Sequence, residues 1–262
     1  MPSADDLGTP LPGGPLRRVV SLVPSLTEAL AVSAPDLLVG ATQWCSHPAE
    51  LDVARVRGTK NPDLAAIGRL RPDLVVMNKE ENRRVDVERL RAAGVAVWVT
   101  VIETVDEALA SLRRLFVAAL ERPVPSWLVE AERVWAVPAP LPRLSAAVPI
   151  WRDPWMVVGP GTFAGDLLAR VGVDNVYGAC AAADGGLAKG GRYPSVTVAD
   201  ILSRRPGVVL LPDEPYAFTA TDGPQAFSGL SCVLVSGRLI SWYGPSMVEA
   251  RLALEASLAP LR

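Results

Sequence analysis

The stretches 71-RPDLVVMNKEEN-82 and 205-RPGVVLLPDEPY-216 share one pattern, and the fold prediction for this chain begins from it. Each begins with Arg-Pro, continues as an apolar run and ends in acidic residues. Alignment of Arg71 with Arg205 gives an offset of 134 positions and superposes Glu80 on Glu214. A short apolar run bounded by proline and polar residues is typical of a buried β-strand. The chain is therefore predicted to build the same strand twice.

Two further pairs support a duplication. Residues 20–30 match residues 157–167 as strand, proline and helix, at an offset of 136 to 137, and the helix that begins at Pro62 matches the one at Pro194 at an offset of 132. Three matches in the same order indicate two similar lobes, and a chance likeness of short apolar runs is the alternative. Strands at 73–78 and 95–100 alternate with helices, which is typical of an α/β unit with a parallel sheet.

The predicted fold class is α/β, with two Rossmann-like lobes that have parallel central sheets, one rigid helical connector and a ligand cleft between the lobes. The Pro/Gly-rich residues 1–16 are expected to be a flexible leader. The N-terminal lobe is expected at 17–102, a connector with helices at 104–120 and 126–136 within 103–143, and the C-terminal lobe at 144–262. Ser25 and Glu28 have capping-box spacing, 144–151 is predicted as one strand, and 232–242 as a hairpin around Ser236 and Gly237.

Composition excludes several functions. The 262 residues carry a net charge of −2 and no basic stripe, which argues against nucleic acid as a partner. No apolar run is long enough to span a membrane, so no direct membrane insertion is expected. The leader has neither an apolar signal region nor a lipobox cysteine, and Cys45, Cys180 and Cys232 have no metal-type spacing. As it stands, the sequence predicts a cytoplasmic monomer, or an extracytoplasmic protein if a leader has been removed.

The first candidate site is 42-TQWCSHP-48, which contains the single histidine of the chain. Trp44 offers an aromatic wall, and Cys45 or His47 an axial contact to a chelated metal. One cysteine and one histidine do not make a closed metal site, so no protein-held metal is predicted. The alternative is a packed loop.

The second candidate site gathers aromatic side chains at predicted strand ends of the C-terminal lobe. Two tryptophans flank Arg152 and Asp153 and are suited to a planar ligand, although they also suit a covered lobe edge. Arg192 and Tyr193 follow the glycine-rich residues 184–191, which carry Lys189 but lack the Walker spacing, so we expect a cleft rim rather than a phosphate loop. The ligand-binding candidates here are Trp151, Trp155, Arg192, Tyr193, Tyr216 and Trp242.

No motif indicates catalysis. The chain has no GxSxG elbow, HExxH, CxxC or GxGxxG sequence, and paired carboxylates such as Glu80 and Glu81 are usually solvated. We therefore assign no catalytic residue and expect that the protein is not an enzyme.

The assembled motifs resemble one known family. RVVSLVPSLTEALA, GATQWCSHP, GTKNPDLAAIGRLRPDLVVMNKEENRR, VPIWRDPWMVVGPGTFAGDLLARVG, RYPSVTVADILSRRPGVVLLPDEPYAF and LVSGRLISWYG are similar to the class III, helical-backbone substrate-binding proteins of ABC importers for vitamin B12, haem and ferric siderophores. The resemblance covers about residues 17–245, and its nearest subset is named cobalamin-binding or helical backbone metal receptor.

The resemblance implies two lobes bridged by a helix and a metal chelate held mainly by aromatic side chains. It also implies an acidic residue on each lobe that pairs with arginines of a membrane permease, here Glu80 or Glu81 and Glu214. It implies no intrinsic cofactor, because cobalamin, haem or a ferric siderophore would be the bound ligand.

The leading hypothesis is therefore a binding protein in which Trp44 and Trp151 are walls and Arg192 clamps a ligand carboxylate or amide. The alternative is a cytoplasmic protein on the same scaffold that acts as an enzyme, carrier or sensor for another small molecule. A purely structural interaction module is the third hypothesis.

Overall fold

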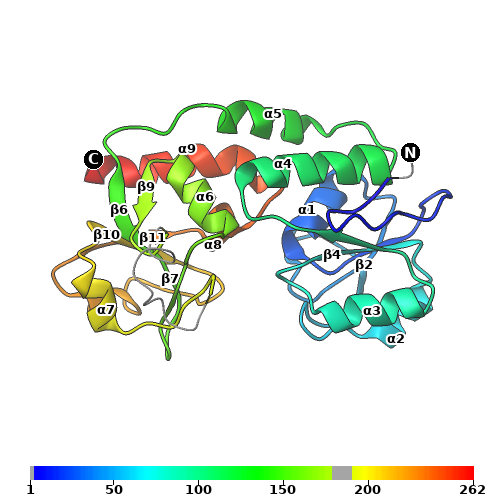
Figure 1. Ribbon diagram of the computed structural model, residues 1–262, viewed down its shortest axis with the longest axis horizontal. Coiled ribbons are helices and arrows are strands. Elements are labelled where there is room, and N and C mark those ends of the chain that lie inside the picture. The colour runs from blue at the N-terminus through cyan, green and yellow to red at the C-terminus, as the bar shows by residue number, and fades with distance from the viewer. Residues whose placement is uncertain (1–2, 179–190) are drawn as a thin grey trace. The chain divides into compact units, whose positions relative to one another are not determined.

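The structure is a computed structural model that describes residues 3–178 and 191–262. The described chain forms two compact units (Figure 1). Unit 1 takes residues up to Ile102, Asp106–Glu132 and Tyr243–Pro245, and unit 2 takes Glu103–Val105, Arg133–Trp242 and Ser246–Arg262. The segment 103–143, expected as a separate connector, is thus divided between the two units.

Unit 1 is built on a parallel sheet with strand order β3-β2-β1-β4-β5. Alternate residues of β4 and β5, such as Val75 and Val99, share one core cluster with Ile67 of α2 and Leu90 of α3, so these two helices cover one face of the sheet. Leu74 and Trp98, which point the other way, are also fully buried. Both faces are therefore covered, as is usual for a parallel sheet. The elements of unit 1 are β1 (Val19–Ser21), α1 (Pro24–Ser33), β2 (Leu38–Ala41), β3 (Ala54–Arg55), α2 (Leu64–Leu70), β4 (Leu74–Asn78), α3 (Arg84–Ala92), β5 (Val97–Thr100), most of α4 (Val105–Arg113), a π-helical segment (Arg114–Ala119) and most of α5 (Ser126–Trp135).

Unit 2 repeats this plan with a sheet of strand order β11-β10-β6-β9. Its core joins Val209 and Leu211 of β10 to Ile201 of α7 and to Phe218 and Phe227. A separate two-stranded antiparallel ribbon joins β7 to β8. The elements of unit 2 are β6 (Leu144–Ala147), β7 (Pro149–Trp151), β8 (Met156–Val157), α6 (Phe163–Arg170), β9 (Val173–Asn175), α7 (Val198–Ser203), β10 (Val208–Pro212), a 3-10 turn (Pro224–Phe227), β11 (Ser231–Val235), α8 (Gly237–Ser241), α9 (Ser246–Leu258) and a second 3-10 turn (Ala259–Leu261).

The predicted duplication is visible in the topology. The order β2-β1-β4-β5 corresponds to β9-β6-β10-β11, with β4 equivalent to β10. The arginines that open the two quoted stretches also share a rare backbone conformation, because Arg71 has φ of 46° and Arg205 has φ of 50°. Left-handed backbone is uncommon outside glycine, so its recurrence at equivalent positions supports a common origin for the two units.

One of the matched pairs was assigned to the wrong strand. The sequence paired Val20 with Val157, but Val157 belongs to the β7–β8 ribbon, whereas the sheet equivalent of β1 is β6. The ribbon is an insertion between that strand and its helix α6, and it also breaks the strand predicted at 144–151. A local match of strand, proline and helix does not reveal which sheet a strand joins.

Residues 3–11 are docked on unit 1, in contrast to the flexible leader that we expected. The carboxylate of Asp5, which is 5 % exposed, accepts a hydrogen bond from the Val99 N–H and pairs with Arg91 at 3.1 Å. Asp6 pairs with Arg114 at 2.7 Å. The segment thereby covers the edge strand β5. Composition did not predict this because the partners lie far along the chain.

Two other local predictions were wrong. α1 begins at Pro24 with Val23 as N-cap and no side-chain cap, so Ser25 and Glu28 form no capping box. The segment 232–242 is not a hairpin, because β11 runs parallel to β10 and α8 follows it. A Cβ at Gly237 would lie 2.3 Å from Glu214 Cγ, so this glycine serves close packing rather than a turn.

Candidate functional site

The loop 42–51 of unit 1 presents one aromatic side chain to solvent. Trp44 is 60 % exposed, which is unusual for a side chain with so large an apolar surface. The loop is held from below by Arg55, whose Nη1 donates to the carbonyls of Thr42 and Cys45 at 3.1 and 2.9 Å. A Cβ at Gly58 would lie 2.4 Å from Asn61 Oδ1 and 3.1 Å from the Trp44 indole nitrogen, so the Trp44 ring packs closely on the Gly58 backbone. The backbone of the loop that carries Trp44 is thus held by hydrogen bonds from Arg55, and a defined loop suits a ligand wall.

Cys45 and His47 differ in accessibility. The Cys45 thiol is buried, with Sγ 3.0 Å from Thr27 Oγ1 and 3.1 Å from Thr42 Oγ1. It packs inside unit 1 and does not offer the axial contact that we expected. His47 is exposed, and its Nδ1 lies 3.1 Å from Ser46 Oγ. Of the two axial candidates, only the imidazole is accessible to a ligand.

The loop that follows β4 is organised by two asparagines. The side chain of Asn78 accepts from the N–H groups of Glu80 and Glu81 at 2.8 and 3.1 Å, and Asn82 donates to the carbonyls of Leu22 and Thr59. Both asparagines are buried, while Glu80 and Glu81 are half-buried. From the sequence we expected a docking role for Glu80 or Glu81 in this stretch and assigned no role to the two asparagines. The signal was an asparagine within a buried apolar run, which needs a defined hydrogen-bonding partner.

In unit 2, the structure brings together most of the predicted aromatic residues. The Trp151 ring meets Tyr216 edge-on with centroids 5.6 Å apart, and Tyr216 lies 4.7 Å from Phe218. Trp155 stacks on Phe218 at 5.8 Å and is half-buried. Trp151 remains 42 % exposed. Trp155 is thus part of the core, and Trp151 is the ring that a ligand can reach.

Polar groups border the exposed ring of Trp151. Tyr216 donates from its hydroxyl to Asp222 at 2.6 Å, and Asp222 also pairs with Arg152. The hydrogen bond from Tyr216 lowers the pKa of Asp222, and the same bond raises the pKa of Tyr216. Asp222 is therefore held as a carboxylate. We predicted neither Asp222 nor its link to Arg152, because they are 70 positions apart.

Arg192 and Tyr193 lie beside β8, where the Val157 N–H donates to the Pro194 carbonyl at 3.2 Å. Arg192 Nη1 pairs with Glu103 Oε1 at 3.0 Å, and its carbonyl accepts from the Gly159 N–H at 2.8 Å. A Cβ at Gly159 would lie 2.8 Å from that carbonyl, so the glycine permits this contact. Tyr193 is half-buried. The arginine expected to clamp a ligand is therefore held by a carboxylate of its own unit.

The positions of Glu214 and Trp242 do not suit the roles expected for them, which were permease docking for Glu214 and ligand binding for Trp242. Trp242 is 8 % exposed, so it is not a ligand wall. Glu214 is half-buried against Gly237, and its Oε1 is buried without a hydrogen-bond partner. Burial raises the pKa of Glu214 despite a hydrogen bond from Trp242. Such a carboxylate is poorly presented for docking.

We also searched the described residues for metal-binding clusters and membrane-spanning helices. Within 3–178 and 191–262, no three His, Cys, Asp or Glu side chains are grouped as a metal site. In that same part of the chain, every helix is too short or too polar to cross a membrane. Lys189, Cys180 and most of the glycine-rich segment 184–191 lie outside the described residues.

Part of this chain is similar in sequence to known proteins. No protein-family model matches. A vitamin B12-binding protein of Vibrio cholerae is 28% identical over 103 residues, which are 38% of this chain and 37% of that protein, so this match spans well under half of the relative's length. A vitamin B12-binding protein of Salmonella typhi is 25% identical over 210 residues, covering 74% of this chain and 71% of the relative.

Solved structures share the fold over nearly the whole chain. The periplasmic vitamin B12-binding protein BtuF of Vibrio cholerae matches with a TM-score of 0.72 and 17% identity, covering 94% of this chain and 98% of that one. The periplasmic heme-binding protein RhuT of Roseiflexus matches with a TM-score of 0.70 and 18% identity, covering 93% and 99%. Helicobacter pylori CeuE, in a nickel–histidine complex, matches with a TM-score of 0.81 and 15% identity, covering 99% and 88%. The chain thus shares its fold with these periplasmic binding proteins, and over part of its length it is similar in sequence to vitamin B12-binding proteins.

Proposed function

We propose that this protein is a binding protein, not an enzyme, and that it holds a metal chelate such as a corrinoid, haem or a ferric siderophore for an ABC-type importer. The relatives named above support this proposal, because they are vitamin B12-binding proteins and their structural counterparts bind vitamin B12 or heme. These ligands share a flat macrocycle or a compact chelate with a large apolar surface. An aromatic wall suits that surface.

The exposure of the tryptophans carries the proposal. Of the seven tryptophans, Trp44 and Trp151 alone are exposed among the described residues, whereas others such as Trp98 and Trp135 are buried. An exposed tryptophan leaves a large apolar ring surface in contact with solvent, and aromatic rings of this kind line many sites for small, flat ligands. These two residues are also the walls that the sequence predicted.

We infer that the polar groups around each wall set the ligand preference. Arg152, held by Asp222, offers donors beside Trp151 to a carboxylate or amide of the ligand. His47 is the candidate axial ligand beside Trp44, and Cys45 is not. Binding would then depend on stacking against tryptophan and on few direct bonds to the metal.

Calorimetric titration with cyanocobalamin, hemin and a ferric hydroxamate siderophore tests this proposal. We expect one of the three to bind with a stoichiometry of one. Trp44→Ala and Trp151→Ala should each weaken its binding about tenfold or more, since an aromatic contact contributes roughly 0.5–1.5 kcal/mol in addition to the apolar area that it buries. Trp127→Phe is the matched control, because Trp127 is half-buried against Phe116 and is not a predicted wall. No binding of any of the three ligands would refute the proposal.

The axial role of His47 is tested separately if hemin binds. His47→Ala should then change the Soret band of the complex, while Cys45→Ala should leave it unchanged. An unchanged spectrum in the His47 variant would exclude imidazole ligation and leave stacking intact.

We propose further that a permease partner is met by Glu80 or Glu81 of unit 1. The backbone N–H groups of both residues donate to the Asn78 side chain, so both belong to a defined loop, and both are half-buried. Their charge reversal, Glu80→Lys with Glu81→Lys, should abolish uptake of the ligand by native cells without changing its affinity in vitro. Normal uptake by this variant would argue against docking through these residues.

The compartment follows from the same proposal. The BtuF and RhuT structures are described as periplasmic, and we propose that this protein also acts outside the cytoplasmic membrane. Fractionation of native cells tests this directly, and recovery in the cytoplasmic fraction would favour a carrier or sensor on the same scaffold.

A further inference from the structure

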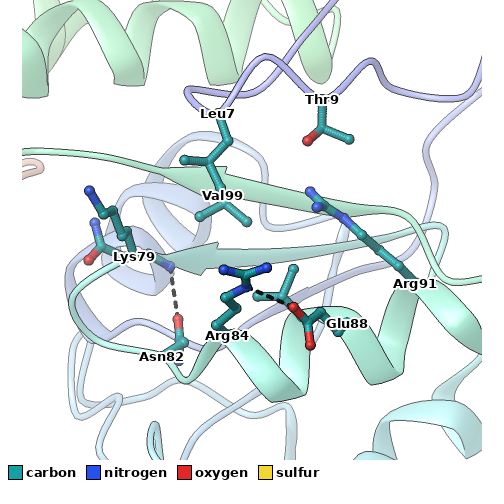
Figure 2. A pocket seen from close by; sticks show the side chains of 10 residues that line it. Leu7, Thr9, Lys79, Asn82, Arg84, Glu88, Arg91 and Val99 are labelled. Atoms are coloured by element: carbon teal, nitrogen blue, oxygen red, sulfur yellow. Dashed lines mark hydrogen bonds and ion pairs between the residues drawn. The ribbon is translucent and has the colours of Figure 1, made fainter.

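Unit 1 contains a cavity of about 400 Å³ that the proposed function does not use (Figure 2). Its walls come from the docked N-terminal segment, the end of β4, strand β5 and helix α3. The loop that carries Trp44 follows β2, at the other side of the sheet from the edge strand β5. The cavity is therefore separate from that loop.

The floor and roof of the cavity are apolar. Val87 and Val99, which both line it, are buried. Leu7 of the N-terminal segment lies over Val99 in Figure 2. Leu7 is 52 % exposed, and its backbone is held in place because its N–H donates to Asp5 Oδ1 at 3.0 Å. A leucine held in this way offers an apolar contact to a ligand without needing to be ordered on binding.

The remaining walls are rich in positive charge. Lys79, Arg84 and Arg91 surround the space below Leu7 in Figure 2. Glu88, the single acidic residue that lines the cavity, pairs with Arg84 at 2.7 Å. Asp5 binds Arg91 at 3.1 Å, and the Lys79 ammonium makes no ion pair within the described residues. The cavity thus has an excess of donors and cations, and Lys79 is available to an incoming anion.

We propose that this cavity is a second binding site, for a small anion with an apolar tail, such as a medium-chain carboxylate. The tail would lie against Leu7, Val87 and Val99, and the acidic head would meet Lys79 with Arg84 at the rim. The volume is at the lower end of the range for small-molecule sites, which suits a ligand of this size. The site does not depend on chelate binding, so either proposal can fail alone.

Titration of the isotope-labelled protein with octanoate, followed by amide chemical shifts, tests the site. Saturable shifts are expected at Lys79, Val87 and Val99 but not at Trp44. Octylammonium, with the same chain and the opposite charge, should give no saturable shift at these residues.

Variants then separate contact from general charge. Lys79→Gln should weaken octanoate about fivefold, because one partly exposed ion pair contributes roughly 1 kcal/mol. Arg69→Gln is the matched control. Arg69 is an exposed residue of α2 that does not line the cavity, so its replacement removes one positive charge and should leave the affinity for octanoate unchanged. Leu7→Ala should also weaken octanoate severalfold without unfolding the protein, because the leucine is half-exposed.

Three results would overturn the proposal. The first is the absence of saturable shifts up to about 10 mM octanoate, at which a 1 mM site would be mostly filled. The second is an equal response to octylammonium. The third is an equal loss of affinity in Arg69→Gln and Lys79→Gln, which would indicate a diffuse charge effect.

Discussion

At the scale of single residues, Cys45 shows how burial separates two neighbouring candidates. Its thiol lies between the hydroxyls of Thr27 and Thr42, while His47 two positions later is exposed. Both were reasonable soft ligands from their residue types alone. Only the packing of the loop against α1 decides which one a ligand can reach.

We predict that Cys45→Ala lowers the free energy of unfolding by about 1–2 kcal/mol, because it leaves a small void and two hydroxyls with one contact fewer. Urea unfolding measures this change. Ligand affinity should be unaffected. Cys232→Ala, at a half-buried position, is the control and should cost less. A loss of affinity in Cys45→Ala with normal stability would show that the thiol acts in binding.

Glu214 predicts a dependence of stability on pH. Burial raises its pKa above the ordinary value of 4.5, so the folded state holds this proton more tightly than the unfolded chain does. The stabilisation is fully present below pH 4.5 and is lost as the pH rises through the raised pKa. Glu214→Gln, which cannot ionise, should therefore be more stable than the parent at neutral pH, and this advantage should vanish in acid.

Urea unfolding at about pH 4 and about pH 7 checks the sign of this effect. The exposed Glu50→Gln serves as control and should show little difference at either pH. Lower stability of Glu214→Gln at neutral pH would mean that the charged carboxylate is favoured in the folded protein.

At the scale of elements, helix α8 begins at Gly237, where the absence of a Cβ allows close packing against Glu214. A Cβ at Gly237 would lie 2.6 Å from the Glu214 carbonyl oxygen, a backbone atom that cannot move aside alone. We predict that Gly237→Ala destabilises the protein by about 1–3 kcal/mol through overpacking. Chemical denaturation measures the cost.

Gly68→Ala provides the matched control within a helix. No atom lies within 4 Å of a Cβ at Gly68 in α2, so this substitution should stabilise by up to about 1 kcal/mol through helix propensity. If both alanine variants had the same stability, close approach at Gly237 would not be the reason for its glycine.

At the scale of the whole molecule, the two units are not successive halves of the chain. Unit 1 needs Asp106–Glu132, which contributes the buried Leu112, Phe116 and Leu128. Each such side chain stabilises by about 1.5–3 kcal/mol when buried. The N-terminal lobe predicted at 17–102 therefore lacks part of its own core.

We predict that a fragment of residues 1–132 unfolds cooperatively, whereas a fragment of residues 1–102 does not. Near-ultraviolet circular dichroism during heating compares them, and Trp98 provides a buried probe in both. Cooperative unfolding of the shorter fragment at a similar temperature would show that α4 and α5 are dispensable for unit 1.

Local patterns predicted the repeated elements well. The strands expected at 73–78 and within 205–216 are β4 and β10. The helices expected at 104–120 and 126–136 are α4 with its π-helical extension and α5. These segments have strong periodicity over their own length, and periodicity is what a sequence displays directly. The β7–β8 ribbon, helix α8 and the docked N-terminal segment were missed, because each depends on partners distant in sequence.

By itself, the sequence determined the fold class, the duplication and the set of aromatic residues from which a site is made. Tertiary structure alone decided that Trp44 and Trp151 are exposed while Trp242 and Cys45 are buried, and that Glu214 packs on Gly237. The physical reason is that strand and helix patterns are encoded by neighbours along the chain, whereas burial is set by residues that meet only after the sheets form.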